Sequence, residues 1–382
     1  MKIIHVIPAY KPAYCYGGPT QSVSFLCENL VKNELQIEVL TTTANGKYEL
    51  NVPRNTPVFI NGVKTYYFRR ISKDHSHFSP KLLFNLYQKA DAKTTIIHIH
   101  SWWNLVSILS CIIAKLKKIP VVLSPRGMLS PYSFGTGNTT IKYLLHQHIG
   151  KELIRYCHLH CTSEQERREL LPIQQVQHIS TIPNMIDTRP HIPLNNSNFD
   201  DASFKMIFLS RIDPKKGLEI LFYALNLLDY KWTLTIAGDG LETYIKVLKE
   251  LAGELRIADK INWTGPATNS NKYAMIAQHH LLVLFSHNEN FANVILESLI
   301  TGTPVAISED VGLAKYVKAN ELGWVAPANH IKIASVLKAA HHNKAKRQNI
   351  KTIAPSLIKE HYNQVLLTQQ YINLYQQIRE KH

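Results

Sequence analysis

Short apolar runs of strand length alternate with longer runs of helical periodicity along this chain. In the first half, strand-like runs lie at residues 3–7, 37–40, 95–99, 121–123 and 159–162, with helical runs such as 22–30 and 105–116 between them. Runs that are apolar at almost every position are typical of strands covered by helices on both faces of a sheet. The alternation therefore predicts βαβ units and an α/β fold with doubly wound, Rossmann-like sheets.

The same pattern returns in the second half, after a break. Prolines and a polar run at 195–201 interrupt the periodicity and predict a linker at 187–204. We expect one domain at 1–186, a second at 205–360, and a helical tail at 361–382. The second domain has predicted strands at 206–210, 232–237, 261–263, 281–285, 304–307 and 324–326.

Composition supports a two-domain protein of the cytoplasm. The chain has 382 residues, 45% of them hydrophobic, which is enough for two α/β cores. Its five cysteines form no C-x-x-C pair and no zinc-finger spacing, which favours reduced thiols. The amino-terminal apolar run is too short for a signal peptide, and the apolar run at 105–114 is about half of the ~20 residues that a membrane-spanning helix needs. We expect a soluble protein, or one peripheral on the inner face of a bacterial plasma membrane.

Positive charge is concentrated in the first half. Residues 1–190 contain 22 Lys and Arg against 11 Asp and Glu, so this part carries +11 of the total +15. A basic surface attracts anionic lipid headgroups or a pyrophosphate-linked substrate. No zinc finger, recognition helix or aromatic RNA-binding motif accompanies the charge, so nucleic acid is not expected as a partner. A merely soluble basic protein remains the alternative.

The segment from Ser286 to Leu299 places two carboxylates eight positions apart across a predicted loop-to-helix junction. Glu289 lies in the turn, and Glu297 lies about two turns down the helix. The first N–H groups of the helix, at 290–294, favour an anion such as a phosphate. Carboxylates accept hydrogen bonds from hydroxyls, so Glu289 suits sugar hydroxyls and Glu297 suits ribose hydroxyls. The alternative is an exposed helix with ordinary solvated glutamates.

A second phosphate-binding corner follows the strand at 206–210. The loop Arg211-Ile-Asp-Pro-Lys-Lys216-Gly217 connects this strand to a helical pattern at 218–228. Arginine can bind two phosphate oxygens at once, and lysine supplies a mobile point charge. Arg211 and Lys216 can therefore neutralise a departing diphosphate. The alternative is that both are surface charges flanking a turn.

Several other chemistries lack their motifs. The first strand is not followed by G-x-G-x-x-G, and no G-x-x-x-x-G-K-[ST] occurs, so a nicotinamide enzyme or an ATPase is not expected. No D-x-D is present to hold a divalent metal on a diphosphate. We therefore expect no metal and no cofactor, with the diphosphate charge met by Arg211, Lys216 and helix amides.

The chain resembles the retaining glycosyltransferases of the GT-B fold, specifically family four, also called group-one glycosyltransferases, of the bacterial surface-polysaccharide type. The resemblance covers nearly the whole chain through motifs that are weak singly and specific in their order. They are Gly17-Gly18-Pro19, Ile97-His-Ile-His100, Ser124-Pro-Arg-Gly-Met128, Thr162-Ser-Glu164, Ile182-Pro-Asn184, Arg211 to Gly217, Ala237-Gly-Asp-Gly240 and Glu289 to Glu297.

This resemblance implies two Rossmann-like domains facing a central cleft, with the final helix crossing back to the first domain. It assigns catalytic roles to His100, Arg211, Lys216 and Glu289. The implied donor-binding residues are Gly17, Gly18, Asn290, Phe291, Ala292, Asn293 and Glu297. Arg126, Trp102 and Trp103 are candidates for acceptor binding, with structural or core roles as their alternatives.

Two positions depart from the family pattern. Ala292 stands where relatives usually have glycine, so an extra methyl group would narrow the donor-sugar pocket. Arg126 stands in a segment where many relatives have histidine, and contact with an acceptor phosphate and a structural role are equally compatible with that change.

The implied reaction is transfer of a hexosyl group from a nucleoside-diphosphate sugar to a glycan, with retention and without metal. The implied acceptor is a lipid-linked oligosaccharide in lipopolysaccharide O-antigen, capsule or exopolysaccharide synthesis. A non-catalytic sugar-nucleotide-binding partner and a sugar-nucleotide epimerase of the same fold are the alternatives. The donor base, the sugar, the linkage and the oligomeric state are left open by the sequence.

Overall fold

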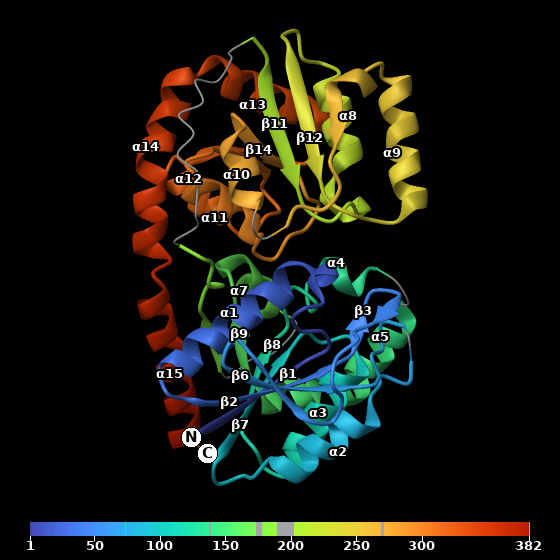
Figure 1. Ribbon diagram of the computed structural model, residues 1–382, viewed down its shortest axis with the longest axis vertical. Helices are drawn as coiled ribbons and strands as arrows, with labels where there is room; N and C mark the ends of the chain where they lie inside the picture. Colours follow the sequence, from blue (N-terminus) through green and yellow to red (C-terminus); the bar gives the residue numbers. More distant parts are fainter. Residues whose placement is uncertain (73, 137–138, 173–177, 189–201, 269–270, 382) are drawn as a thin grey trace. The chain divides into compact units, whose positions relative to one another are not determined.

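The computed structural model describes residues 1–382 apart from 73, 137–138, 173–177, 189–201, 269–270 and 382 (Figure 1). Its chain divides into two compact units. Unit 1 comprises Met1–Met185 and Gln364–His382, and unit 2 comprises Ile186–Asn363. Most of the predicted linker at 187–204 lies outside the described residues. Among the described residues, no helix combines the length and the apolar character that crossing a membrane requires.

Unit 1 is built on an eight-stranded sheet with the order β10-β9-β8-β7-β1-β2-β6-β5. Every neighbouring pair is parallel except β5 with β6. The strands are β1 (Lys2–Ile7), β2 (Gln36–Thr42), β5 (Pro57–Ile60), β6 (Val63–Phe68), β7 (Thr95–His100), β8 (Val121–Ser124), β9 (His158–Cys161) and β10 (Ile179–Thr181). A separate hairpin joins β3 (Ala44–Asn45) to β4 (Tyr48–Glu49).

The helices of unit 1 are α1 (Gly18–Lys32), α2 (Pro80–Lys89), α3 (Leu105–Leu116), α4 (Pro131–Phe134), α5 (Thr139–Leu145), α6 (Lys151–Tyr156), α7 (Glu164–Leu170) and α15 (Gln364–Glu380) (Figure 1). Local chemistry fixes several of their starts. The side chain of Asn104 accepts a hydrogen bond from the Ser107 amide at the start of α3, and Ser163 accepts one from Glu166 at the start of α7.

Unit 2 has a six-stranded, fully parallel sheet with the order β13-β12-β11-β14-β15-β16. Its strands are β11 (Phe204–Leu209), β12 (Trp232–Ala237), β13 (Ile261–Trp263), β14 (Leu281–Leu284), β15 (Val305–Ser308) and β16 (Gly323–Ala326). Its helices are α8 (Leu218–Leu225), α9 (Glu242–Glu254), α10 (Lys272–Ala277), α11 (Asn293–Ile300), α12 (Ala314–Ala319), α13 (His330–His342) and α14 (Lys344–His361).

The strand orders create one topological switch point in each sheet. In unit 2 the chain builds outward from β11 through β12 to β13, and then returns to build outward from β14 on the other side. In unit 1 the corresponding reversal lies between β1 and β7. Loops that leave the carboxyl ends of two such strands diverge and leave a crevice, where open α/β sheets bind their ligands. The predicted site residues should therefore follow β1, β7, β11 and β14.

The predicted α/β architecture with two Rossmann-like sheets is confirmed. Each predicted strand is present with bounds within about two residues of the expectation. The two edge strands β5 and β10, strand β6 next to β5, and the β3–β4 hairpin were missed. Their sequences mix polar, aromatic and aliphatic residues, and β5 is only partly buried, so neither an apolar run nor a strict alternation marks them.

Candidate active site

In unit 2 the loop after β11 meets the loop after β14. Asp213 caps the turn Pro214–Lys216 by accepting a hydrogen bond from the Lys215 amide at 3.0 Å. Gly217 follows in the left-handed region, at φ +69°, and a Cβ there would lie 2.2 Å from the carbonyl oxygen of Phe285. The His287 amide donates to the Lys215 carbonyl at 2.9 Å. This close packing of backbone on backbone places Lys216 beside the end of β14.

Lys216 and Glu289 form an ion pair where these two loops meet. Their side chains are only 11% and 20% exposed, and the ammonium group of Lys216 donates to Glu289 Oε2. The backbone of Glu289 is held on both sides, because its amide donates to Asp310 and its carbonyl accepts from Gly312. The two residues that the sequence assigned to opposite ends of a donor are thus direct neighbours, 73 positions apart in the chain.

Arg211 lies at the same edge but takes no part in this pair. Its side chain is exposed, and it forms no ion pair or side-chain hydrogen bond among the residues that the structure describes. Lys215, which the sequence interpretation passed over, is half-buried beside the pair. Burial lowers the pKa of Lys215, and the nearby Glu289 carboxylate opposes that effect. The only sequence signal for Lys215 was its place next to Lys216.

Helix α11 begins at Asn293, two residues after the start at Phe291 that the helical spacing of 291–299 predicts, because Ala292 takes up the left-handed conformation at φ 63° and ψ 75°. Glu289 and Asn290 lie in the preceding loop, and Glu297 lies within the helix, as predicted. Phe291 is buried, with its ring 6.3 Å from that of Tyr362. The left-handed conformation is costly for a residue with a Cβ, which gives a physical reason why glycine suits position 292.

Glu297 is buried, and its carboxylate has a partner that the sequence did not suggest. Lys272, the first residue of α10, donates to Glu297 Oε1 at 2.7 Å. A single lysine at the start of a short helix has no motif or periodicity that would single it out.

In unit 1, Gly17 and Gly18 follow β1 at its switch point. Gly17 has φ 69° and ψ −135° and immediately precedes α1. A Cβ at Gly17 would have no protein atom within 4 Å, so the backbone angle demands glycine here and the surrounding space is open. That open space leaves room for a ligand to approach the backbone.

His100 ends β7 and is completely buried. Its Nε2 lies 2.9 Å from His5 Nδ1, and its Nδ1 lies 3.4 Å from Arg126 Nη2. Arg126 also donates to Ser22 and to Asn184, each at 3.1 Å. Guanidinium groups only donate hydrogen bonds, so His100 carries its proton on Nε2 and donates to His5. Both ring nitrogens of His100 are therefore engaged within unit 1.

A second buried chain of hydrogen bonds runs beside the first. Tyr375 of α15 contacts His98 Nδ1, His98 Nε2 contacts Ser124, and Ser124 contacts His160 Nδ1, each at 2.7 Å. His160 Nε2 lies 2.9 Å from the Ile182 carbonyl. Because a carbonyl only accepts, His160 donates to Ile182, and every other hydrogen bond of the chain must donate in the same direction. The donors therefore follow the order Tyr375, His98, Ser124 and His160. This chain ties α15 to the sheet of unit 1.

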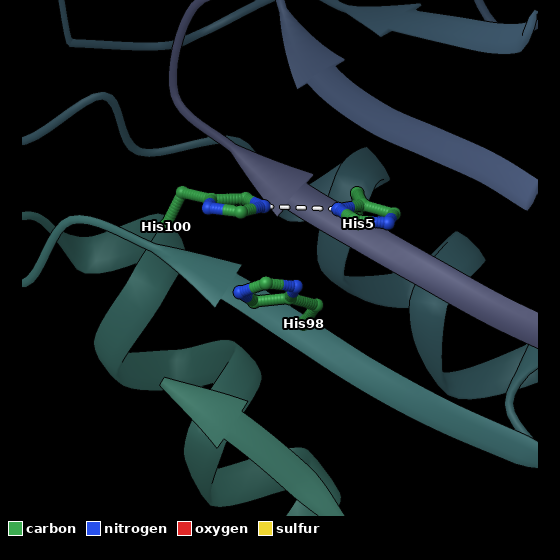
Figure 2. Close-up of side chains that lie close together, drawn as sticks. All are labelled: His5, His98 and His100. Carbon is green, nitrogen blue, oxygen red and sulfur yellow. Dashed lines mark hydrogen bonds between the residues drawn. The ribbon is translucent and has the colours of Figure 1, made fainter. Parts of the chain in front are cut away.

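Three of these histidines lie close enough together to be considered as metal ligands. His5, His98 and His100 bring possible ligand atoms within 4.8 Å of one another. Figure 2 shows a hydrogen bond joining the facing nitrogens of His5 and His100. The planes of these two rings differ by only 7°. Both nitrogens of His98 are used by hydroxyl groups, and Arg126 adds positive charge where a cation would lie. The geometry is that of a hydrogen-bonded group and does not fit a divalent metal.

Acid is expected to destabilise unit 1 through these histidines. Burial is the largest cause that lowers the pKa of His5 and of His160 to about 3, and it also lowers the pKa of His98 and of His100. Below about pH 6.5 the unfolded chain takes up protons that the folded chain does not. Each such histidine then removes about 1.4 kcal/mol of stability per pH unit as the pH falls.

Urea unfolding at a series of pH values measures this effect. The free energy of unfolding should fall steeply below about pH 6. The change of the free energy of unfolding with pH should be smaller in His98→Gln, by the amount that corresponds to about one proton. It should stay the same in the control His75→Gln, because His75 lies on the surface. An unchanged slope in His98→Gln would contradict the assignment.

The two tryptophans have different surroundings. Trp102 is 1% exposed and belongs to the hydrophobic core of unit 1. Trp103 is less buried, donates from Nε1 to the Met128 carbonyl, and has its ring centroid 5.1 Å from that of Phe134. The structure therefore favours a role in the hydrophobic core for Trp102. Trp103 is the better placed of the two to stack on an acceptor.

Two glycosyltransferase family models together match most of the chain. Residues 16–189 match the model of "Glycosyltransferase Family 4", and residues 194–356 match that of "Glycosyl transferases group 1". An uncharacterised glycosyltransferase of Methanocaldococcus jannaschii is 25% identical, with 98% of each chain covered. A D-inositol 3-phosphate glycosyltransferase of Streptomyces bingchenggensis is 22% identical, with 86% of this chain and 78% of that protein covered.

Solved structures show the same fold across the whole chain. Sucrose-phosphate synthase from Thermosynechococcus elongatus has a TM-score of 0.82 at 17% identity, with 100% of both chains covered. Anabaena HepE, solved with UDP and glucose, has a TM-score of 0.75 at 17% identity, covering 99% of this chain and 100% of that one. With the two family models spanning nearly all of both units, the chain belongs to the group 1 glycosyltransferases and has the GT-B fold.

Proposed function

We propose that the protein transfers a hexosyl group from a nucleoside-diphosphate sugar to a hydroxyl of a glycan, with retention and without a metal ion. The observation that carries this proposal is the pairing of Lys216 with Glu289 at the switch point of unit 2. A cation and a carboxylate side by side match the two chemistries of such a donor. Its diphosphate needs positive charge, and its sugar hydroxyls need an acceptor.

The donor roles follow from these groups. Lys216, with Arg211 exposed at the same edge, neutralises the charge that develops on the leaving diphosphate. Glu289 exchanges its lysine partner for sugar hydroxyls when the donor binds. Glu297 accepts from the ribose, and the loop from Asn290 to Asn293 provides amides for the phosphates. From unit 1, Gly17 and Gly18 keep the roles that the family resemblance implies. The implied role of His100 requires one of its ring nitrogens to leave its present partner, His5 or Arg126.

The chemical step needs no protein nucleophile in this proposal. The leaving phosphate takes the proton of the attacking hydroxyl on the same face of the sugar, which preserves the anomeric configuration. The new glycosidic bond forms as the bond to the diphosphate breaks. The protein contributes orientation and charge stabilisation.

Known neighbours support a nucleotide-sugar donor. HepE structures contain UDP or UDP-glucose, and a trehalose-6-phosphate synthase structure contains UDP-2-fluoro glucose. WaaG, described as a glycosyltransferase involved in lipopolysaccharide biosynthesis, has a TM-score of 0.73 at 14% identity. We propose a lipid-linked oligosaccharide of a surface polysaccharide as the acceptor class, to be tested against free oligosaccharide in a transfer assay.

A thermal-shift screen with UDP-, GDP-, ADP- and dTDP-sugars tests the donor. One nucleotide class should stabilise the protein by about 2.7 kcal/mol at a hundredfold excess over its Kd. Excess EDTA should leave that stabilisation and the transfer rate unchanged. Mass analysis of the products, with and without acceptor, separates transfer from simple binding and from release of free sugar. The absence of a shift with every donor would refute the proposal.

A further inference from the structure

Lys272 and Glu297 form an ion pair. Within the described part of unit 2, its two side chains are less exposed than those of the other ion pairs. The two side chains are 10% and 8% exposed, and Lys272 Nζ lies 2.7 Å from Glu297 Oε1. The same ammonium group lies 4.9 Å from the centroid of the Tyr273 ring. The lysine is thus held between a carboxylate and an aromatic face, which fixes its position.

Both partners keep unused hydrogen-bonding capacity. Within the described part of the chain, Glu297 Oε2 accepts from no side chain, and the ammonium group of Lys272 donates to Glu297 alone. An ammonium group has three N–H donors, and each carboxylate oxygen can accept more than one hydrogen bond. The pair therefore presents donors and acceptors side by side to a ligand that has both, and a hydroxyl group is such a ligand.

Stability alone gives little reason to bury these charges. Removing two charges from water is costly, and a buried pair can often be replaced by apolar residues of similar size without loss. The pair therefore fits a recognition role, in which the lysine holds one carboxylate oxygen in place and leaves the other for the ligand.

We propose that Lys272 is a positioning residue that holds Glu297 in place for ribose hydroxyls, so that the site selects nucleotides with both ribose hydroxyls over nucleotides that lack the 2′- or the 3′-hydroxyl. This inference rests on the proposed function, in which Glu297 contacts the ribose. Lys272 fixes the side chain of Glu297 through its hydrogen bond to Oε1. A ligand without the hydroxyl leaves part of the pair's capacity unused, and a buried polar group without a partner is unfavourable.

Calorimetry with matched nucleotides tests this inference. The probes are UDP, GDP and ADP, each compared with its 2′-deoxy and 3′-deoxy forms, using the full-length protein. The wild type should bind the ribonucleotide roughly 10- to 100-fold more tightly than at least one deoxy form, as expected for one lost buried hydrogen bond. Lys272→Met should reduce that ratio to within about twofold of unity, and Lys272→Arg, which keeps the charge, should restore part of it.

The control variants distinguish three explanations: a positioning role of Lys272, a purely structural role of Lys272, and no ribose contact by Glu297. If Lys272 acts through Glu297, adding Lys272→Met to Glu297→Gln should not change the ratio further. A folded Lys272→Met variant that keeps the wild-type ratio would overturn the inference, because a purely structural tie between α10 and α11 alters stability and not ribose selection. If Lys272→Met does not fold, Lys272→Gln decides in its place, with a wild-type ratio again overturning the inference. Unchanged nucleotide affinity in Glu297→Gln would instead refute the ribose role within the proposed function.

Discussion

Replacing Lys216 with alanine is expected to lower kcat by about 10²–10³, the scale for losing one preorganised electrostatic group. The variant loses the cation that the proposed mechanism sets against the leaving diphosphate. It also leaves Glu289 without its ion-pair partner. Steady-state kinetics with the donor identified by the thermal-shift screen would measure kcat and KM separately, and the melting temperature would show whether the fold is kept.

Matched variants sharpen this test. Lys246, on α9, has a side chain that is 78% exposed and lies 3.9 Å from Glu250, so Lys246→Ala removes a lysine from a surface ion pair. Its kcat should remain at the wild-type level. Arg211→Ala should act in the same direction as Lys216→Ala, with a smaller effect because Arg211 is exposed. Wild-type turnover in a folded Lys216→Ala variant would remove its role on the diphosphate.

Replacing Gly217 with alanine is expected to destabilise unit 2 by about 2–5 kcal/mol and to lower kcat as well. The new Cβ would lie 2.2 Å from the Phe285 carbonyl oxygen, and the residue has φ +69°. Overpacking costs roughly 1–3 kcal/mol, and the left-handed conformation adds roughly 1–2 kcal/mol. Because Lys216 precedes Gly217, any shift that relieves the contact moves Lys216. Thermal unfolding followed by calorimetry measures the loss.

Gly253 provides the control for this substitution. It lies in α9, where a Cβ would meet no atom within 4 Å. Gly253→Ala should raise stability by about 0.5–1 kcal/mol, because alanine favours the helix and has less backbone freedom to lose. Similar melting temperatures for the two variants would show that the contact between residue 217 and Phe285 relaxes at little cost.

Much of the fold could be predicted because its signal is local. A parallel strand buried on both faces must be apolar at successive positions, as in β14 with the sequence Leu-Leu-Val-Leu. Strand β6 could not be recognised in this way, because its polar and aromatic residues are buried only through its pairing with β2 and β5. That pairing is a property of the assembled sheet.

The candidate site shows the same division. Arg211 and Lys216 were singled out at one predicted loop-to-helix junction and Glu289 and Glu297 at another, and within each junction the two residues lie at most eight positions apart in sequence. Their partners were not. Glu297 meets Lys272 across 25 positions, Lys216 meets Glu289 across 73, and His98 meets Tyr375 across 277. No local pattern encodes which of many lysines or tyrosines arrives at a given carboxylate or imidazole.

The sequence by itself determined most of the buried parallel strands, several of the helices and the residue types at the strand ends, because hydrophobic periodicity and backbone conformation act over a few neighbouring residues. The tertiary structure alone decided which charges neutralise each other, which histidine nitrogens carry protons, and which side chains are buried. Those outcomes depend on strand order and on the close approach of backbones at the switch points, which only the folded chain brings together.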